Sequence, residues 1–356
     1  MTPYTTLILS ASEVERIIRE VGLHPLMDEL NVRMEKTFLE YDPAKTIVPV
    51  RSGFNYTKPE VGLVEWMPLY QTGELVLIKV VGYHPNNPNK YGVPTIVSTI
   101  SNYDTATGHL KSLIDGILPT ALRTGSASAV ASKYLAHPES KILGLIGCGA
   151  QAVTQLHALS RVFAFEEVLY YDIDPDTTES FPGRVAALEL QINMRSVAIG
   201  EIVRQADILC TATSIGVGEG PLFDHLPTKE HLHINAVGAD FPGKTELPLS
   251  LLHECYVCPD FHQQALVEGE CQQLEDAEIG ENLFNCMQEP AKFTRLRQQR
   301  TVFDSTGLSL EDMVVMDLFV AYAKQLGLGK EVALENMFPD AKNPYHFATI
   351  PVGDLV

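Results

Sequence analysis

An acid and a base lie four residues apart on a glycine-containing turn in the stretch INAVGADFPGKTEL, residues 234–247. The stretch begins as an apolar run that is typical of a buried strand, and the turn that follows contains Gly238, Asp240 and Lys244. In open parallel sheets, ligands bind beyond the carboxyl ends of the strands. We therefore expect Asp240 to exchange protons with a bound molecule and Lys244 to hold that acid or the molecule. The alternative for both side chains is a solvated turn.

A glycine loop follows an earlier apolar strand. The residues Gly147-Cys-Gly149-Ala-Gln-Ala152 open a helix, which is the position that a dinucleotide-binding loop occupies. The first glycine permits a tight turn, and the second lets the backbone approach a pyrophosphate at the helix N-terminus. Asp172 follows twenty residues after Ala152, where a carboxylate binds ribose hydroxyls and repels a 2′-phosphate. The pattern favours NAD over NADP, and the alternative is a glycine turn in another α/β domain.

Hydroxyl side chains follow two further strands. Thr211 and Thr213 end the strand DILCTAT, and Ser305 and Thr306 end the strand TVFDSTG. The carboxyl ends of parallel strands meet at one edge of a sheet. We therefore expect these side chains to lie with Asp240 in one crevice, where a nicotinamide ring would bind.

Four charged residues between positions 51 and 123 are candidate site residues. Glu65 lies in LVEWMP and Lys79 lies in LVLIKVVGY, where a charge is costly unless it is paired or used. Alternation along a half-buried strand offers another explanation, in which each charge points to solvent. Arg123 lies among small residues on a helix that we expect to be buried, so it needs a protein carboxylate, a cofactor phosphate or a substrate carboxylate as its partner. Arg51 is the fourth such residue.

The elements that must position these residues fall into two groups. We expect a capping box at Ser12–Glu15, two helices over 13–40 separated at Pro25, antiparallel strands over 61–110 and a helix over 117–136. From Lys141 the pattern becomes strand–helix alternation, which predicts a parallel sheet. Its expected strands are 141–147, 166–172, 207–213, 231–238 and 301–307, with helices at 150–163 and 185–192. A last amphipathic helix, 309–326, is expected to return to the first domain.

The composition excludes several classes of protein. The 45 acidic and 26 basic residues give a formal charge of −19, which disfavours nucleic acid and anionic membranes as partners. We see neither an apolar run long enough to span a membrane nor a signal peptide. The six cysteines include the pair Cys255 and Cys258, which lacks the other ligands of a zinc site. We expect buried thiols, no metal site and a cytoplasmic protein.

The motifs GCGAQ, VGADFPGKTEL, TALRT, LVEWMP, IKVVGYHP and VFDSTG together resemble the ornithine cyclodeaminase/mu-crystallin family. The resemblance runs in order over roughly residues 10–330. It implies an α/β fold with a Rossmann-type NAD-binding domain, 137–308. It also implies a discontinuous α+β domain, 1–136 and 309–356, that binds substrate and forms a homodimer through its sheet.

The resemblance also implies roles for individual residues. Asp240 matches the general acid/base, and Glu65 matches an acid in the substrate pocket. Four residues match positions that hold the substrate: Arg51, Lys79, Arg123 and Thr306. With the strand ends and the glycine loop, the expected cofactor site comprises Thr95, Gly147, Gly149, Ala150, Gln151, Asp172, Thr211, Thr213, Gly238, Lys244 and Ser305.

The implied reaction is redox-neutral cyclising deamination of a basic L-amino acid, with L-ornithine giving L-proline and ammonia as the first expectation. The run from Lys79 to His84 departs from the Lys-Tyr-Val-Asn-Gly-His-Pro run of ornithine enzymes, and a Thr-Arg pair expected before Glu268 is missing. These departures leave the side-chain length open, so L-lysine is an alternative. An amino acid dehydrogenase or cyclic-imine reductase of the same family is a second alternative, and a non-enzymatic binding protein is a third.

Overall fold

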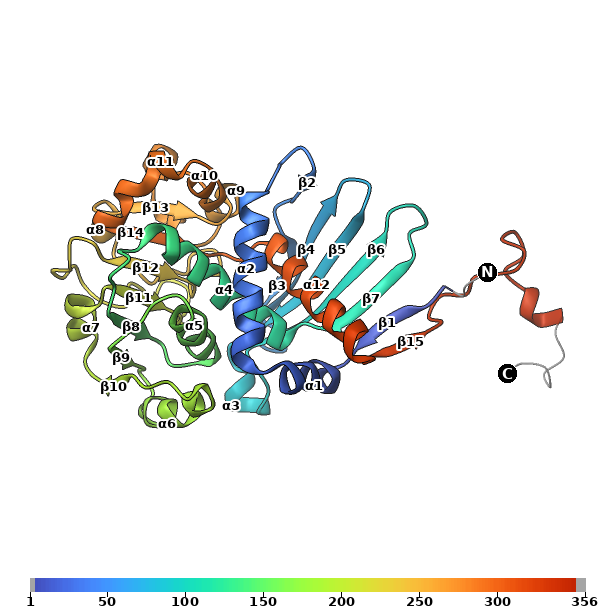
Figure 1. The fold of residues 1–356 in the computed structure, drawn as a ribbon, viewed down its shortest axis with the longest axis horizontal. Helices are drawn as coiled ribbons and strands as arrows, with labels where there is room; N and C mark the ends of the chain where they lie inside the picture. Colours follow the sequence, from blue (N-terminus) through green and yellow to red (C-terminus); the bar gives the residue numbers. More distant parts are fainter. Residues whose placement is uncertain (1–3, 350–356) are drawn as a thin grey trace.

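The protein, in a computed structural model that describes residues 4–349, folds around two sheets that lie side by side (Figure 1). One sheet takes all its strands from residues 142–304, and the other takes its strands from residues 6–115 and 330–332. The chain therefore leaves the second sheet, builds the first and returns.

The seven-stranded sheet is parallel throughout, as the strand–helix alternation predicts. Its order is β10-β9-β8-β11-β12-β14-β13, so the direction of winding reverses between β8 and β11. That reversal is where doubly wound sheets bind their ligands. The strands are β8 Ile142–Ile146, β9 Glu167–Tyr171, β10 Asn193–Ser196, β11 Ile208–Thr211, β12 His233–Ala236, β13 Tyr256–Pro259 and β14 Thr301–Asp304.

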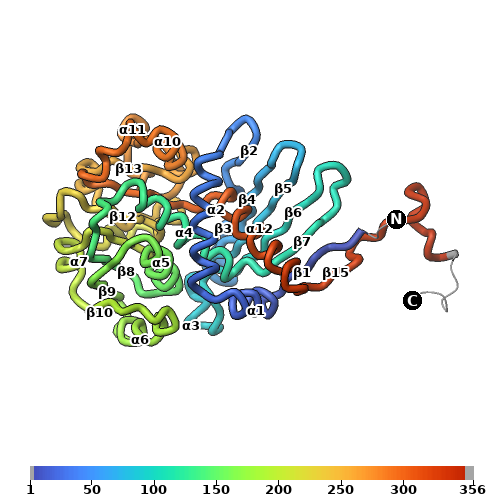
Figure 2. Tube along the Cα trace, viewed as in Figure 1, coloured from blue at the N-terminus to red at the C-terminus, as the bar shows by residue number. Residues whose placement is uncertain are grey.

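The eight-stranded sheet is mixed, and its four central strands are antiparallel neighbours, which confirms the expectation for residues 61–110. Its order is β15-β1-β7-β6-β5-β4-β2, with β3 also paired to β4. The outer strands β1 and β15 come from opposite ends of the chain and pair with each other (Figure 2). The strands are β1 Thr6–Leu9, β2 Thr46–Ile47, β3 Ser52–Tyr56, β4 Gly62–Gln71, β5 Leu75–Tyr83, β6 Ile96–Asp104, β7 Leu110–Asp115 and β15 Lys330–Val332.

Helix α4, Ile117–Leu135, joins the two sheets and is buried along most of its length. Its small side chains allow close helix packing: a Cβ at Gly125 would lie 2.4 Å from the Thr154 carbonyl oxygen of α5. Helix α12, Ser309–Leu326, returns to contact β4, β5, α2 and α4. The remaining helices are α1 Ala11–Val21, α2 Leu23–Leu39, α3 Asn87–Tyr91, α5 Ala150–Ser160, α6 Pro175–Val185, α7 Ile199–Gln205, α8 Leu249–Leu252, α9 His262–Ala265, α10 Leu283–Gln288 and α11 Pro290–Phe293.

Three local expectations are wrong. The capping box of α1 uses Ser10 and Glu13 instead of Ser12 and Glu15. The break between α1 and α2 lies at Gly22, whose φ is 91°, whereas Pro25 lies in the first turn of α2, where a missing N–H costs little.

The helix expected over 185–192 ends at Val185 instead, as α6. Asp174 caps its N-terminus by accepting hydrogen bonds from the backbone N–H groups of Asp176 and Thr177, and Pro175 occupies the first helical position. The capping residues therefore start the helix ten residues before the expected range. Strands β1, β2, β3, β10 and β15 were not expected either.

The six cysteines are free thiols, and all except Cys255 are buried, as expected. Within residues 4–349, no three His, Cys, Asp or Glu side chains cluster in a way that would hold a metal ion. In the same part of the chain, no helix has both the length and the apolar character needed to cross a bilayer.

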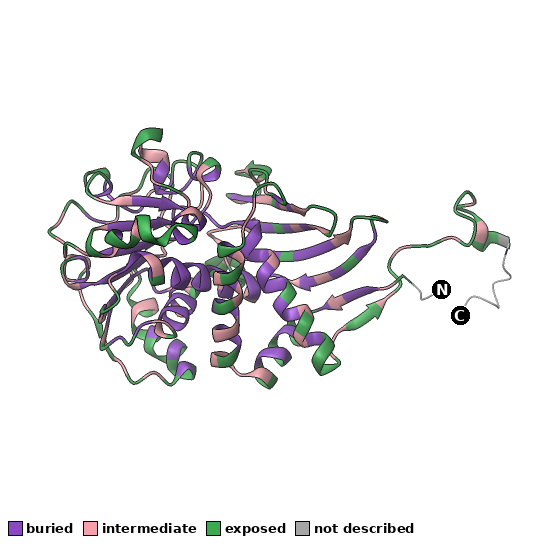
Figure 3. Cartoon of the chain, turned by 45° about the horizontal axis from the view of Figure 1, so that its top comes forward, coloured by how far each residue is buried: buried purple, intermediate pink, exposed green. Residues whose placement is uncertain are grey.

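The strands β4, β5 and β6 have two different faces, and Figure 3 shows buried and exposed residues alternating along them. On the inner face, register partners form three rows of side chains. We name them the end row (Leu63, Tyr83 and Ile96), the acid row (Glu65, Val81 and Ser98) and the clamp row (Met67, Lys79 and Ile100).

Candidate active site

A cleft of about 650 Å³, open solvent included, lies between the inner face of the eight-stranded sheet and the carboxyl ends of the parallel strands. It brings together eight of the expected site residues: Arg51, Glu65, Lys79, Arg123, Gln151, Asp240, Ser305 and Thr306. Members of all three rows line it as well: Leu63, Met67, Val81, Tyr83 and Ile96. Residues that are up to 256 positions apart therefore share one concave surface.

Lys79 and Arg123 form a buried cation pair at the clamp row. Lys79 is 1% exposed, so the alternative in which it points to solvent is wrong. Its Nζ lies 2.7 Å from Asp312 Oδ2, and Arg123 lies 3.1 Å from Asp312 Oδ1 through Nε and 2.5 Å from Glu311 Oε2 through Nη1. The anion partner that Arg123 requires is thus a protein carboxylate, although the guanidinium also lines the cleft.

Glu311 and Asp312 were not expected at the site. Both lie in the first turn of α12 and are fully buried. The only hint in the sequence is two adjacent acids at the start of an otherwise apolar helix, where acids are also ordinary helix-stabilising residues.

Burial shifts the protonation of this cluster. Burial, aided by the nearby Arg123 charge, lowers the pKa of Lys79 to about 8. Burial likewise raises the pKa of Glu311 to about 7, against the opposing effect of Arg123. The pKa values of Lys79 and Glu311 therefore lie closer to neutral pH than those of an exposed lysine or glutamate.

Arg51 connects the two halves of the cleft. Its Nη1 donates to Glu65 Oε1 at 3.0 Å, and its Nη2 lies 3.1 Å from Glu268 Oε1. The same Nη2 donates to the carbonyl oxygens of Thr306 and Gly307 at 2.5 and 2.8 Å. Burial disfavours the Arg51 charge, but Glu268 and Glu65 outweigh it and raise its pKa. A substrate carboxylate would therefore share this guanidinium with the protein.

Two acids near Arg51 were also not expected. Burial raises the pKa of Glu268 to about 8, although Arg51 works in the other direction. Asp260 accepts hydrogen bonds from the Thr306 hydroxyl at 3.0 Å and from the Gly307 backbone N–H at 2.6 Å. The Thr306 side chain is thus held by Asp260, and its main chain by Arg51.

Asp240 and Lys244, the acid and base of the turn after β12, form an ion pair. Lys244 Nζ lies 2.9 Å from Asp240 Oδ1, and the lysine side chain is 3% exposed. Burial disfavours the Lys244 charge, but the adjacent Asp240 outweighs it and raises its pKa. Gly243 has a φ of 81°, which lets the turn bring Lys244 back onto Asp240. Lys244 therefore holds the acid, and Asp240 lines the cleft.

Three buried acids, Glu246, Glu270 and Asp304, fix the loops around this turn by accepting hydrogen bonds from backbone N–H groups. Glu246 accepts hydrogen bonds from the backbone N–H groups of Thr213 and Gly238, at 2.7 and 3.0 Å. Glu270 in turn accepts from the Glu246 N–H at 2.7 Å, and Asp304 accepts from the Glu270 N–H at 2.9 Å.

Gly238 leaves no room for a side chain, because a Cβ there would lie 2.3 Å from Glu246 Oε1. Thr213 and Gly238 therefore shape the site through Glu246, and neither lines the cleft. Glu246 lies in the stretch 234–247, but the loops whose N–H groups it binds come together only in the folded structure.

The glycine loop has the features of a dinucleotide site. Gly147 has a φ of 89°, and a Cβ there would lie 2.6 Å from the Ala212 carbonyl oxygen. Gly149 is the N-cap of α5, and no atom lies within 4 Å of the position its Cβ would take, so the space before the helix is open. Ala150 and Gln151 begin α5, whose first N–H groups suit a phosphate.

Further residues fit the same ligand. Asp172 follows β9 and accepts hydrogen bonds from the backbone N–H groups of Cys148 at 2.7 Å and Asp174 at 3.0 Å, which places its carboxylate beside the loop. The Ser305 hydroxyl is buried and has no hydrogen-bond partner among residues 4–349. An orphaned polar atom in a binding cleft is the kind of group that a bound ligand satisfies.

Nine of the expected cofactor residues do not line the cleft itself: Thr95, Gly147, Gly149, Ala150, Asp172, Thr211, Thr213, Gly238 and Lys244. Thr95 precedes β6, where its carbonyl oxygen accepts a hydrogen bond from the His84 N–H at 2.9 Å. Thr211 ends β11 and is fully buried.

Comparison with known proteins identifies the family of the chain. The family model "Ornithine cyclodeaminase/mu-crystallin family" matches residues 12–325. An L-lysine cyclodeaminase of Streptomyces rapamycinicus is 41% identical over 341 residues, which are 96% of this chain and 99% of the relative.

Two solved structures have the same fold. A lysine cyclodeaminase, solved to explain its recognition of L-lysine, L-ornithine and L-2,4-diaminobutyric acid, superposes with a TM-score of 0.93 at 44% identity, over 96% of this chain and 99% of that one. An archaeal alanine dehydrogenase dimer with bound NAD gives a TM-score of 0.81 at 30% identity, over 94% and 100%. The chain belongs to the ornithine cyclodeaminase/mu-crystallin family.

Proposed function

We propose that the protein catalyses the NAD-dependent, redox-neutral cyclising deamination of a basic L-amino acid. One observation carries the proposal: Lys79, Arg123 and Glu65 line the same cleft as the Asp240 side chain, which Lys244 holds. A diamino acid needs these groups, because it presents a carboxylate, an α-ammonium that must lose a proton and a second ammonium. A simple binding protein has no need of the acid and base on the turn.

The glycine loop and Asp172 support NAD as the cofactor, since a carboxylate beside the loop suits ribose hydroxyls and repels a 2′-phosphate. The related alanine dehydrogenase has NAD bound. When bound, NAD would accept a hydride from the substrate Cα and later return it. Gly147, Gly149, Ala150 and Gln151 would hold the pyrophosphate, and the orphaned Ser305 hydroxyl would bind nearer the ring.

The chain's own groups divide the remaining work. The Lys79 and Arg123 charges hold the substrate carboxylate, and Arg51 adds a third cation that the substrate shares with Glu65 and Glu268. Asp240 removes a proton from the α-ammonium and later returns one to the departing ammonia. Glu65, one row away from Lys79, receives the distal ammonium and takes its proton before the amine attacks Cα.

The two substrates that the reaction suits are L-lysine, which would give L-pipecolate and ammonia, and L-ornithine, which would give L-proline and ammonia. The 41% identical relative is a lysine cyclodeaminase, which supports L-lysine as strongly as the first expectation of L-ornithine. The related structure concerns recognition of both amino acids. We therefore propose that both are accepted.

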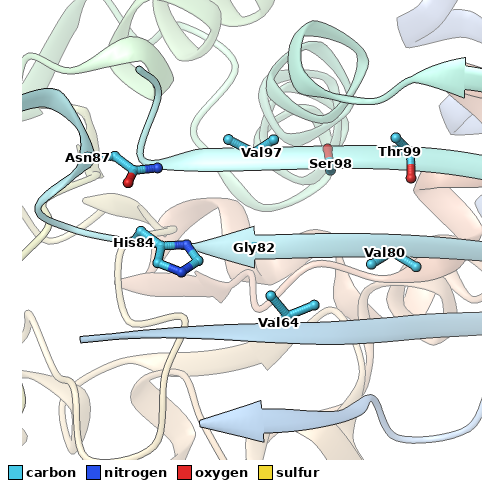
Figure 4. A pocket seen from close by; sticks show the side chains of 8 residues that line it. All are labelled: Val64, Val80, Gly82, His84, Asn87, Val97, Ser98 and Thr99. Carbon is cyan, nitrogen blue, oxygen red and sulfur yellow. The ribbon is translucent and has the colours of Figure 1, made fainter. Parts of the chain in front are cut away.

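We also propose that the protein forms a homodimer through the outer face of the eight-stranded sheet. Figure 4 shows Val64, Val80 and Val97 on three neighbouring strands of that face, beside a hollow that His84 and Asn87 also line. Val80 and Val97, on the neighbouring strands β5 and β6, are 41% and 42% exposed, which makes this part of the face apolar. The related alanine dehydrogenase is a dimer. We further propose that residues 1–136 and 309–356 bind the substrate and form the dimer, and that residues 137–308 bind NAD. Residues 1–3 and 350–356 of these ranges lie outside the described part of the chain.

The decisive experiment follows nitrogen and hydride separately. Purified protein is incubated with L-lysine or L-ornithine labelled with ¹⁵N at the α-amine and with substoichiometric NAD. We expect many turnovers per NAD, labelled ammonia, an unlabelled ring nitrogen and no accumulation of NADH. Stoichiometric NADH with an oxo acid would instead establish a dehydrogenase, and no reaction with any diamino acid would refute the proposal.

A further inference from the structure

Tyr83 lies at the end of the cleft that is farthest from the clamp row. It occupies β5 four residues after Lys79, on the same inner face, and its register partners are Leu63 and Ile96. Four residues of extended strand span about 13 Å, so the two side chains stand at opposite ends of the three rows. All three members of the end row line the cleft. A side chain that extends from the clamp row past Glu65 therefore meets Tyr83.

Tyr83 also reaches the acid–base pair on the other side of the cleft. Lys244 Nζ lies 3.4 Å from the Tyr83 hydroxyl and 5.1 Å from the centre of its ring. Contact with both the hydroxyl and the ring face of one tyrosine restricts where the ammonium can lie. The same Nζ is bonded to Asp240 at 2.9 Å. One side chain of the eight-stranded sheet thus contacts the lysine that holds the acid.

Burial keeps the Tyr83 hydroxyl in its neutral form. Burial raises the pKa of Tyr83, although the Lys244 charge works in the other direction, so the phenol remains protonated at neutral pH. A phenol oxygen accepts a hydrogen bond from an ammonium without cancelling its charge. Lys244 therefore keeps its full attraction for Asp240.

We propose that Tyr83 has two functions in the reaction: its ring sets the longest side chain that the cleft accepts, and its hydroxyl positions Lys244 against Asp240. This inference rests on the proposed function, because it names the residue that selects among diamino acids. It makes Tyr83 a specificity-determining and positioning residue, whereas Asp240 remains the group that exchanges protons with the substrate.

Two substitutions separate the two functions. Tyr83→Phe removes the hydroxyl and keeps the ring, and Tyr83→Val removes the ring and keeps a residue that favours strands. Tyr70→Phe is the matched control, because Tyr70 lies on β4 and its hydroxyl accepts a hydrogen bond from the Gly73 N–H, away from the cleft. Thermal unfolding of each variant establishes that it folds.

Side-chain length is tested by binding to the NAD-loaded protein, measured by calorimetry with L-2,4-diaminobutyrate, L-ornithine, L-lysine and L-homolysine. We expect the wild type, Tyr83→Phe and Tyr70→Phe to bind L-homolysine at least about tenfold more weakly than L-lysine, the penalty of one overpacked methylene or more. In Tyr83→Val the ratio should shrink to about threefold or less. A ratio in Tyr83→Val equal to that of the wild type would overturn the ring's role.

The hydroxyl is tested by kinetics on the preferred substrate. For Tyr83→Phe we expect kcat to fall about three- to tenfold, the equivalent of one long hydrogen bond, with KM within about twofold. The pH profile of kcat should be displaced, because Lys244 no longer has a fixed position beside the acid. An unchanged kcat and pH profile would overturn the hydroxyl's role.

These measurements distinguish a failure of the Tyr83 inference from a failure of the proposed function. Failure of the wild type to cyclise lysine or ornithine would refute the reaction, while the binding ratios would still test Tyr83. Absence of binding for all four amino acids would overturn both.

Discussion

The two faces of strands β4, β5 and β6 each carry residues that depart from the usual distribution of charged and apolar side chains. The inner face, which is covered by α12 and the parallel-sheet loops, carries Lys79 and Glu65, whereas the outer face carries exposed Val80 and Val97. Charges normally face solvent and valines face the core. Lys79 and Val80 are sequence neighbours, yet one is 1% exposed and the other 41%.

These departures indicate that each face does more than pack a core, although buried apolar residues such as Leu69, Leu77 and Ile100 share the inner face with Lys79. A buried charge costs free energy unless it is paired, and on the inner face Lys79 is paired with Asp312 and Glu65 with Arg51. Exposed apolar side chains on neighbouring strands are typical of contact surfaces, which is why we propose the outer face as the dimer interface. Substitutions on each face test whether a change on one face leaves the expected property of the other face unaltered.

The largest effect is expected for Asp240, which lines the cleft together with residues of the inner face. Asp240→Asn keeps the shape of the side chain but removes its capacity to take a proton, so kcat should fall about 10²- to 10⁴-fold. NAD affinity, measured by fluorescence titration, should change less than about twofold, because Asp240 has no part in the glycine loop. Turnover at the wild-type rate would remove Asp240 from the mechanism.

The neighbours Lys79 and Val80 offer a matched comparison of the faces. Lys79→Met leaves Asp312 buried with Arg123 as its remaining cation, so unfolding in urea should show a loss of about 3 kcal/mol. Val80→Met should change the free energy of unfolding by less than about 0.5 kcal/mol, since its side chain lies at the surface. Equal losses for the two variants would contradict the assignment of the faces.

The charge of Lys79 should appear in the pH dependence of binding. With its pKa lowered to about 8, Lys79 is protonated below that pH and loses its charge above it. The Kd of the cyclic product, measured on the NAD-loaded protein, should therefore rise above pH 8, by at most about tenfold per pH unit. Lys79→Arg should remove this rise, because a guanidinium stays charged. A Kd that is constant to pH 10 in the wild type would show that the clamp does not depend on the Lys79 charge.

The smallest effect on activity is expected from the outer face. Val80→Asp should shift the protein from dimer to monomer in light scattering, while kcat stays within about threefold of the wild type. Val32→Asp is the control, because Val32 is an exposed valine on α2, outside this face. A monomeric wild type, or a dimer that survives Val80→Asp, would refute the proposed interface.

Local patterns were sufficient for much of the fold. Strand–helix alternation identified the parallel sheet, and period-two alternation identified β4 to β7. They failed where a cap or a single glycine decides an element: Ser10, Gly22 and Asp174 fix helix ends that propensity placed elsewhere. Short edge strands such as β10 and β15 were missed, because three or four residues give too little pattern.

The candidate site was predictable to a different extent. Strand-end position identified Asp240 and Ser305, and isolated charges identified Lys79 and Arg123. The partners of those charges were not predictable, since Asp312 lies 233 residues from Lys79 and Glu311 lies 188 residues from Arg123. Thr213 and Gly238 were expected beside the cofactor, but the structure engages them with Glu246.

The sequence by itself determined the types of chemistry, because glycine turns, strand ends and charges in apolar strands are local properties of the chain. Only the tertiary structure decided which charges neutralise one another and which remain exposed to a substrate. The physical reason is burial: the cost of a charge depends on what surrounds it in space, and here those surroundings come from residues at both ends of the chain.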